Sequence, residues 1–155
     1  MTAWQPIAPP DLADLLRQTR PELDALFALL PAPTAAEAAG HWHGTLMAVR
    51  GLGWLPRPLA HGLYRLLALP LNPWRGKSFG GETGANRWFT AHGAAFGRFR
   101  VQASASGVDG QPTLLLDYDL PENPAALRPI RGEARRLGDG LLLARMNWQG
   151  ARGLH

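Results

Sequence analysis

The second half of the chain is built of short segments in which apolar and polar residues alternate. GRFRVQASA at 97–105 has this period-two pattern, and TLLLDYDL follows at 113–120 after the turn-forming residues GVDGQP. IRGEARRL at 130–137 and LLLARMNW at 141–148 flank GDG, a good hairpin signal. Successive side chains of a β-strand point to opposite faces, so each segment predicts a half-buried strand. Several such strands joined by turns predict a small antiparallel sheet that curls into a β-barrel.

The segment at about 10–39 has helical features instead. Apolar residues recur every three or four positions between 10 and 30, and Pro21 predicts a break near Arg20 because proline lacks an N–H for the helix ladder. Thr34 and Glu37 have the spacing of a capping box, which predicts one short turn before Gly40. The expected fold class is therefore α+β. We expect a single domain over 1–155, with a helical segment at about 10–39 and a small antiparallel barrel at about 40–150.

One more helix, at about 57–69, is predicted as an insertion in the barrel region. Its leucines share one side, while Arg57, His61 and Arg65 recur every four residues and share the other. Such a helix suits either a lid over the barrel or peripheral contact with an anionic membrane surface. Both interpretations stay open.

Composition limits the location and the partners that we expect. Lys77 is the only lysine among 16 basic residues, and the net charge is +4. The arginines are scattered rather than clustered beside stacking aromatics, so nucleic acid is not an expected partner. The absence of cysteine excludes disulfides, thiolate ligands and cysteine nucleophiles. No secretory signal and no apolar run of about 18 residues is visible, which favours a cytoplasmic protein.

The segment AAGHWHGTL at 38–46 has two competing interpretations. His41 and His43 would share one strand face, so both could reach a metal ion, or one could be an axial haem ligand. A metal site needs a third ligand, and no other histidine or carboxylate lies at a spacing from His41 and His43 that is typical of metal sites. Alternatively, Trp42 closes one end of the barrel while Gly40 and Gly44 let neighbouring backbone come close. We favour this packing interpretation.

Two short motifs resemble those of a known protein family. LLPAPTAAEAAGHWHG at 29–44, followed by NPWRGKSF at 72–79, resembles the bacterial and fungal family named for its Gly-X-Trp-X-Gly motif. The matching residues are Gly40, Trp42 and Gly44 in the first motif and Trp74, Gly76, Lys77 and Phe79 in the second. The segment 116–148 is similar to the companion C-terminal domain of that family. The resemblance implies a lipocalin-like barrel and no established activity, and the insertion at 51–71 departs from the family pattern.

NPWRGKSF also offers a candidate binding residue. Lys77 could hold a ligand carboxylate or phosphate at the mouth of a pocket. The alternative, which we favour from the sequence, is a turn at Gly76 with Lys77 in solvent and Trp74 and Phe79 buried.

LLLDYDL at 114–120 places two carboxylates on one strand face. Asp117 and Asp119 would lie opposite Tyr118 and could perform acid–base chemistry if burial separated their pKa values. The alternative is that they face solvent or meet nearby arginines such as Arg128 and Arg131.

Together these features predict non-catalytic binding of a small hydrophobic molecule, fatty-acid-, sterol- or isoprenoid-like, in a barrel cavity without a cofactor. The candidate ligand-binding residues are His43, Met47, Lys77, Arg100, Leu116, Tyr118 and Met146. One alternative is a haem or metal protein that uses His41 or His43. Another is an enzyme on a hydrophobic substrate with His43 or Asp119 as general base. The oligomeric state is left open.

Overall fold

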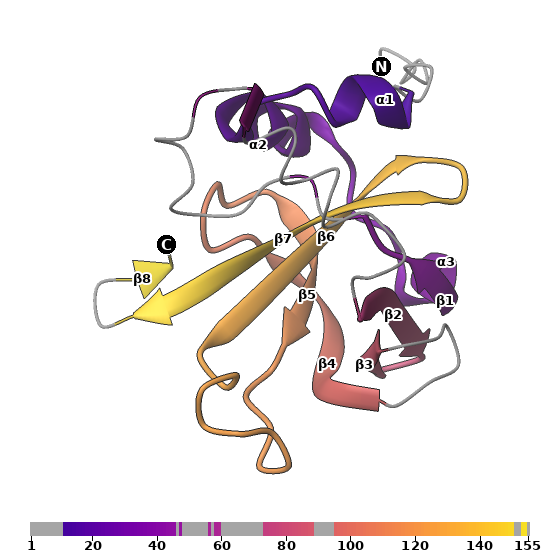
Figure 1. Ribbon diagram of the computed structural model, residues 1–155. Helices are drawn as coiled ribbons and strands as arrows, with labels where there is room; N and C mark the ends of the chain where they lie inside the picture. Colours follow the sequence, from indigo (N-terminus) through magenta and orange to yellow (C-terminus); the bar gives the residue numbers. More distant parts are fainter. Residues whose placement is uncertain are drawn as a thin grey trace.

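The computed structural model describes residues 11–45, 47, 56, 58–59, 73–88, 95–150 and 153–154. Its main element is an antiparallel sheet in which strands β1 to β7 pair in chain order and curl into a half-barrel (Figure 1). The strands are β1 (Gly40–His43), β2 (Trp74–Gly80), β3 (Thr83–Trp88), β4 (Ala95–Ala105), β5 (Pro112–Asp117), β6 (Ile130–Gly138) and β7 (Leu141–Gly150). A short β8 (Gly153–Leu154) pairs with the end of β7.

The curled antiparallel sheet confirms the barrel-like, β-rich prediction. β4, β5, β6 and β7 cover the alternating segments, and Gly140 in the β6–β7 turn has a φ of +70°, which glycine adopts readily. The predicted turn at Gly76 is wrong, because Gly76 lies within β2, and β2 forms a hairpin with β3. Glycines interrupt the apolar pattern in both strands, so the sequence did not reveal this hairpin. The predicted helix at 57–69 lies almost entirely outside the described residues.

Short helices precede the sheet: α1 (Leu12–Leu15), α2 (Arg20–Leu29) and α3 (Ala35–Ala38). Pro21 lies in the first turn of α2, where a backbone N–H has no partner within the helix, so proline is tolerated there. Glu37 accepts a hydrogen bond from the Thr34 backbone N–H at 2.8 Å, and the Thr34 hydroxyl accepts from the Glu37 N–H at 3.1 Å. This capping box begins α3 as its spacing indicates. None of the helices in the described ranges is long and apolar enough to cross a bilayer.

The inside of the curl carries the larger apolar cluster, which we call the inner core. It contains Ala38, Phe79, Phe99, Val101, Leu114, Leu116, Tyr118 and Ala134. The Phe99 ring centroid lies 5.4 Å from that of Phe79 on β2 and 5.2 Å from that of Tyr118, which follows β5. β2 and β5 are not neighbours in the sheet. The curl of the sheet nevertheless brings Phe79 of β2 and Tyr118 after β5 into contact with the same residue, Phe99.

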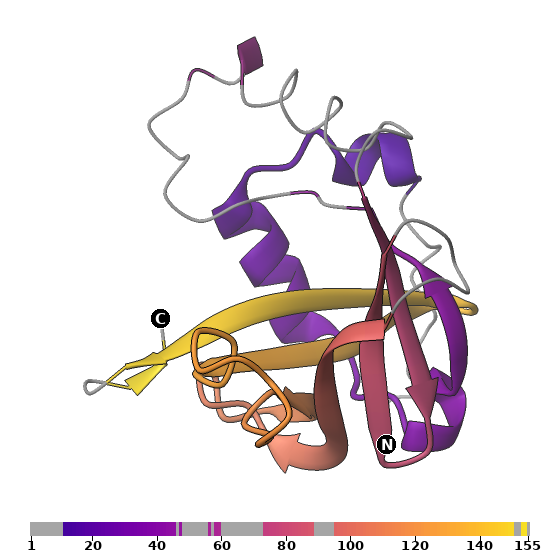
Figure 2. The ribbon, with the colours of Figure 1, turned by 60° about the horizontal axis from the view of Figure 1, so that its bottom comes forward.

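A second cluster, the outer core, lies on the opposite face of the sheet, between α2 and the β6–β7 hairpin. Figure 2 shows α2 lying over this hairpin. It contains Leu15, Leu23, Phe27, Leu137 and Leu143. The β6–β7 hairpin is therefore covered by α2 on its outer face, while its inner face continues the lining of the half-barrel.

Candidate functional site

Polar side chains from three parts of the sheet meet on its inner face. Lys77 on β2 donates through Nζ to Oδ1 of Asn86 on β3 and to Oη of Tyr118, both at 2.6 Å. The Asn86 amide group donates to the same Tyr118 oxygen at 3.2 Å, and Trp74 Nε1 donates to Asn86 Oδ1 at 3.2 Å. We call these four residues the Lys77 cluster. The cluster joins β2, β3 and the end of β5 across the half-barrel.

Strand register and one bulge position the cluster. Lys77 and Asn86 are directly opposed in the β2–β3 pair, so their side chains share the inner face. The β3–β4 pair shifts register between Ala85 and Asn86. On β4, Gly97 has a φ of +73°, and a Cβ there would lie 2.9 Å from the Asn86 amide nitrogen. Gly97 therefore leaves room for the Asn86 side chain, whose amide donates to the Gly97 carbonyl at 3.4 Å.

Aromatic rings surround the Lys77 nitrogen. Nζ lies 5.2 Å from the Phe99 ring centroid, 5.3 Å from that of Tyr118 and 5.9 Å from that of Trp74. Ring faces favour the ammonium form, but removal from water opposes it more strongly. Burial consequently lowers the pKa of Lys77 from 10.5 to about 7. Burial also raises the pKa of the Tyr118 hydroxyl above its ordinary value of 10.0.

Lys77 has no carboxylate partner in the described residues, which include all 12 Asp and Glu side chains of the chain. Every ion pair in this part of the chain involves an arginine. Buried cations are ordinarily paired, because transfer of an isolated charge out of water is costly. Among the described residues, therefore, no carboxylate supplies a counter-charge to this desolvated amine.

The Lys77 cluster also has more donors than acceptors. A lysine ammonium has three N–H donors, and Lys77 uses two of them. The Tyr118 hydroxyl can donate to Asn86 Oδ1, but at 3.5 Å, and that oxygen already accepts from Lys77 and Trp74. One N–H of Lys77 and the O–H of Tyr118 therefore lack a good acceptor among the described residues. A group that only accepts hydrogen bonds, such as a carboxylate, complements this arrangement.

The glycines and tryptophans of the two sequence motifs interlock across β1 and β2. A Cβ at Gly44 would overlap the Trp74 ring, and a Cβ at Gly76 would overlap the Trp42 carbonyl oxygen. Trp42 packs against the inner core and donates from Nε1 to the Ala38 carbonyl at 2.7 Å. These packing contacts explain why glycines and tryptophans occupy the motif positions. They also fix β2 beside β1, with the Lys77 side chain on the inner face.

The other predicted ligand-binding residues are divided between the two faces. Leu116 is fully buried in the inner core, and Met146 lies beside it on the same face with 44% of its surface exposed. Arg100 is exposed on the outer face and pairs with Asp117 at 3.2 Å. Met47 packs against the outer core rather than the inner one. Arg100 and Met47 therefore do not line the inside of the half-barrel.

His41 and His43 alternate with Trp42 along β1, and both lie exposed on the outer face. Across the described ranges, no group of three or more His, Asp or Glu side chains is arranged to hold a metal ion. Haem or metal binding by these histidines stays a prediction from the sequence.

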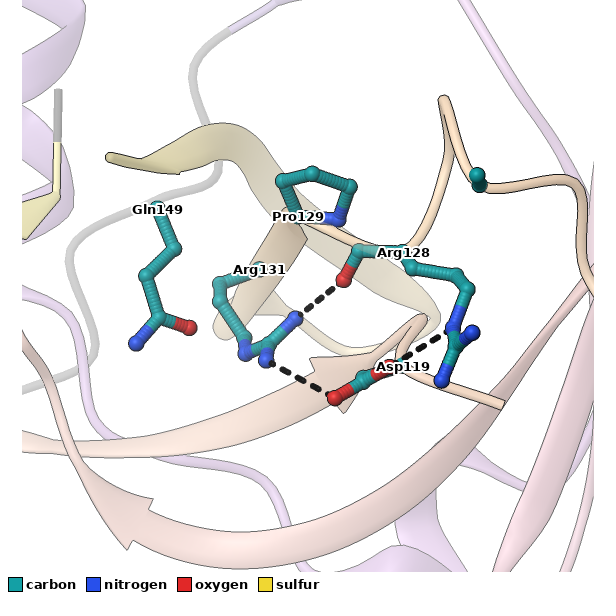
Figure 3. Close-up of a pocket in the computed structure, with 6 residues that line it drawn as sticks. Asp119, Arg128, Pro129, Arg131 and Gln149 are labelled. Atoms are coloured by element: carbon teal, nitrogen blue, oxygen red, sulfur yellow. Dashed lines mark hydrogen bonds and ion pairs between the residues drawn. The ribbon is translucent and has the colours of Figure 1, made fainter. Parts of the chain in front are cut away.

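Asp119 lies at a hollow on the outer surface, shown in Figure 3. It pairs with Arg128 at 2.9 Å and with Arg131 at 3.9 Å, and the hollow has a volume of about 360 Å³. The remaining lining residues are Ala125, Pro129 and Gln149. The charged groups here pair with one another, unlike Lys77.

An ionic network beneath α2 has no counterpart in the sequence predictions. Glu133 and Arg135, both on β6, have no exposed surface. Arg145 donates to Glu133 at 2.8 Å, and Arg135 donates to Asp109 at 2.7 Å and to the Phe27 carbonyl at 2.9 Å. The Phe27 ring centroid lies 4.4 Å from the guanidinium carbon of Arg135 and 4.3 Å from that of Arg145. The hydrogen bond from Arg135 lowers the pKa of Asp109 to about 2. The network ties α2 to the sheet.

Sequence reasoning missed this network and also Asn86. Charged residues at alternate positions of IRGEARRL are typical of a solvent-facing strand, whereas in the fold Glu133 and Arg135 are covered by the turn at 106–111 and by Phe27 of α2. Asn86 follows Gly84 and Ala85, and these small neighbours do not indicate a buried amide at this position. Comparison of the chain with family models, with curated proteins and with solved structures finds no match.

Proposed function

We propose that the inner face of the half-barrel binds a small hydrophobic molecule with a carboxylate group, and that the Lys77 cluster holds the carboxylate. The observation that carries this proposal is the desolvated Lys77 amine, which has neutral hydrogen-bond partners and no carboxylate partner among the described residues. An ionised ligand supplies the missing charge and accepts the spare N–H and O–H donors. Binding is non-catalytic and needs no cofactor.

The apolar part of the ligand has a suitable surface beside the cluster. Tyr118 neighbours Ile130 on β6, and Ile130 pairs with Trp148 on β7. This row runs along the inner face from the buried Tyr118 ring to Trp148, which is 48% exposed. Met146, on the next row, is also exposed. A hydrocarbon chain that covers these two side chains removes apolar surface from water, which favours binding by roughly 25 cal/mol per Å².

The half-barrel and the interlocked motif residues are consistent with a lipocalin-like protein of the Gly-X-Trp-X-Gly family. We include that relationship in the proposal. Ligands of lipocalin-like barrels lie inside the curl of the sheet, which is where Lys77 and Tyr118 lie in this chain.

The test is a comparison of dodecanoate with dodecan-1-ol, which has the same chain length and no charge. Titration calorimetry should show binding of dodecanoate to the wild-type protein, and Lys77→Met should weaken it about 10- to 100-fold, as expected for loss of a charge-assisted hydrogen bond. Dodecan-1-ol should bind both proteins alike. Arg100→Met is the matched control, because it removes one positive charge from the outer face and should leave dodecanoate affinity unchanged. Equal dodecanoate affinity in wild type and Lys77→Met would refute the proposal.

A further inference from the structure

The geometry of the Lys77 cluster points to a second, covalent reaction: we propose that the Lys77 amine condenses with the carbonyl group of a hydrophobic aldehyde to form an imine. The inference rests on the proposed function only for the place of the hydrocarbon chain. The reaction itself depends on the amine and its hydrogen-bond partners.

The surroundings of Lys77 favour the neutral amine that such a reaction needs. Its nitrogen is held by an amide oxygen and a phenol oxygen, with three aromatic rings nearby and no side-chain carboxylate to keep it protonated. With its pKa lowered to about 7, the amine is about half neutral at neutral pH. An ordinary lysine has about one neutral amine in a few thousand at that pH. Desolvation of this kind is a recognised way to activate a lysine nucleophile.

Position matters as much as protonation. Two hydrogen bonds of 2.6 Å fix Nζ, and Tyr118 keeps its proton because burial raises its pKa. The Tyr118 O–H can therefore donate to the carbonyl oxygen of an aldehyde that approaches Nζ. Lys77 is half-buried. The reaction requires that the carbonyl carbon of a ligand on the inner face reach Nζ.

The reaction balances without an oxidant or a reductant. The nitrogen lone pair forms a C–N bond while the carbonyl electrons move to oxygen, which takes a proton and gives a carbinolamine. The carbinolamine then loses its hydroxyl group and the remaining N–H hydrogen as water, and the C=N bond forms. Asn86 Oδ1 accepts an N–H of the amine at the start of this sequence. Both hydrogens of the neutral amine leave with the former carbonyl oxygen.

The composition of the chain makes the test unusually clean, because Lys77 is the only lysine. The full-length protein is treated with dodecanal and cyanoborohydride, which reduces an imine to a stable amine, and its intact mass is measured. We expect one dodecyl group on Lys77, located in the tryptic peptide that spans 76–87. The labelling rate should rise with pH to a plateau with a midpoint near 7. Lys77→Arg, which keeps a cation but cannot form an imine, should lose this adduct, leaving only reaction at the N-terminal amine.

Two further measurements separate the inference from the proposed function. Formaldehyde with cyanoborohydride as the reductant should also methylate Lys77 with a midpoint near pH 7, whether or not the inner face binds hydrocarbon chains. Tyr118→Phe should slow dodecanal labelling about tenfold if its O–H assists the carbonyl. Dodecanoate binding without labelling of Lys77 by either aldehyde would overturn the inference and leave the proposed function standing. Labelling of Lys77 by formaldehyde without dodecanoate binding would refute the proposed function and leave the inference standing. A rate that keeps rising towards pH 10, as for an ordinary lysine, would also overturn the inference.

Discussion

The side-chain nitrogen of Lys77 lies 2.6 Å from the hydroxyl oxygen of Tyr118, although 41 positions separate the two residues in the chain. Both side chains lie on the inner face of the half-barrel, and each is moved away from its ordinary titration range by burial. Both the stability of the protein and its binding of a carboxylate at Lys77 should therefore depend on pH.

The first prediction concerns the pH dependence of unfolding. The pKa of Lys77 is about 7 in the folded protein and near 10.5 when the chain unfolds, so between these values the unfolded chain binds the proton and the folded protein does not. Raising the pH through this window should therefore stabilise the wild-type protein relative to Lys77→Met, by up to about 1.4 kcal/mol per pH unit. Below about pH 7 both states are protonated, and the difference between the two proteins should become constant.

Urea unfolding of both proteins, from about pH 6 to 9.5, measures this difference. The upper limit matters because the raised pKa of Tyr118 acts with the opposite sign above about pH 10, where unfolded tyrosine loses its proton first. Arg100→Met should follow the wild-type profile in parallel. Parallel profiles for wild type and Lys77→Met would show that Lys77 titrates normally.

The second prediction is that dodecanoate binding takes up a proton. At about pH 8.5 Lys77 is mostly neutral in the free protein, and a bound carboxylate should raise its pKa and recharge it. Calorimetry in two buffers of different ionisation enthalpy should show uptake of nearly one proton at this pH and little at about pH 6. Lys77→Met should bind weakly without proton uptake. Equal proton uptake by wild type and Lys77→Met would show that a group other than Lys77 takes up the proton.

The third prediction concerns the interlocked motif residues. Gly44→Ala should destabilise the protein by about 1–3 kcal/mol, because its methyl group would overlap the Trp74 ring. Gly80→Ala is the matched control: it lies at the end of β2, where an added Cβ meets nothing within 4 Å. Its effect should stay within about 0.5 kcal/mol. Thermal unfolding of the two variants compares them directly, and equal losses would argue against the packing role of Gly44.

The fourth prediction concerns the ionic network beneath α2. Glu133→Gln keeps the shape of the side chain but leaves Arg145 without its buried carboxylate and places amide hydrogens against its N–H donors. Removing one member of a buried ion pair should cost about 3 kcal/mol or more. Glu82→Gln, at an exposed position in the β2–β3 turn, makes the same chemical change and should cost less than about 0.5 kcal/mol. Similar unfolding midpoints for the two variants would contradict a stabilising network.

Short-range patterns in the sequence predicted much of the β-structure. The alternation in GRFRVQASA and the GDG turn correspond to β4 and to the β6–β7 hairpin, and Gly40 begins a strand as expected. The β2–β3 hairpin escaped prediction because its glycines, including Gly76 and Gly84, make room for partners that are distant in the sequence. A Cβ at Gly76 would overlap the Trp42 carbonyl oxygen, and a Cβ at Gly84 would overlap the Phe99 ring. No pattern within β2 or β3 predicts these two contacts.

For the candidate site, the sequence indicated Lys77 and Tyr118 but not their contact or the place of Asn86 between them. It also favoured solvent for Lys77, which the curl of the sheet instead brings beside Phe99. The residue types of Arg100 and Met47 suit a ligand pocket. In the fold, however, Arg100 pairs with Asp117 on the outer face and Met47 packs against the outer core.

By itself, then, the sequence determined where the strands and turns of the second half of the chain and the start of α3 lie, because alternation, capping and turn chemistry act between residues a few positions apart. It also determined that one lysine stands among many arginines. Only the tertiary structure decided that this lysine loses its water beside Tyr118, and that Glu133 and Arg135 are buried beneath α2. Burial and charge pairing depend on which distant segments cover a side chain, and that is set by the curl of the whole sheet.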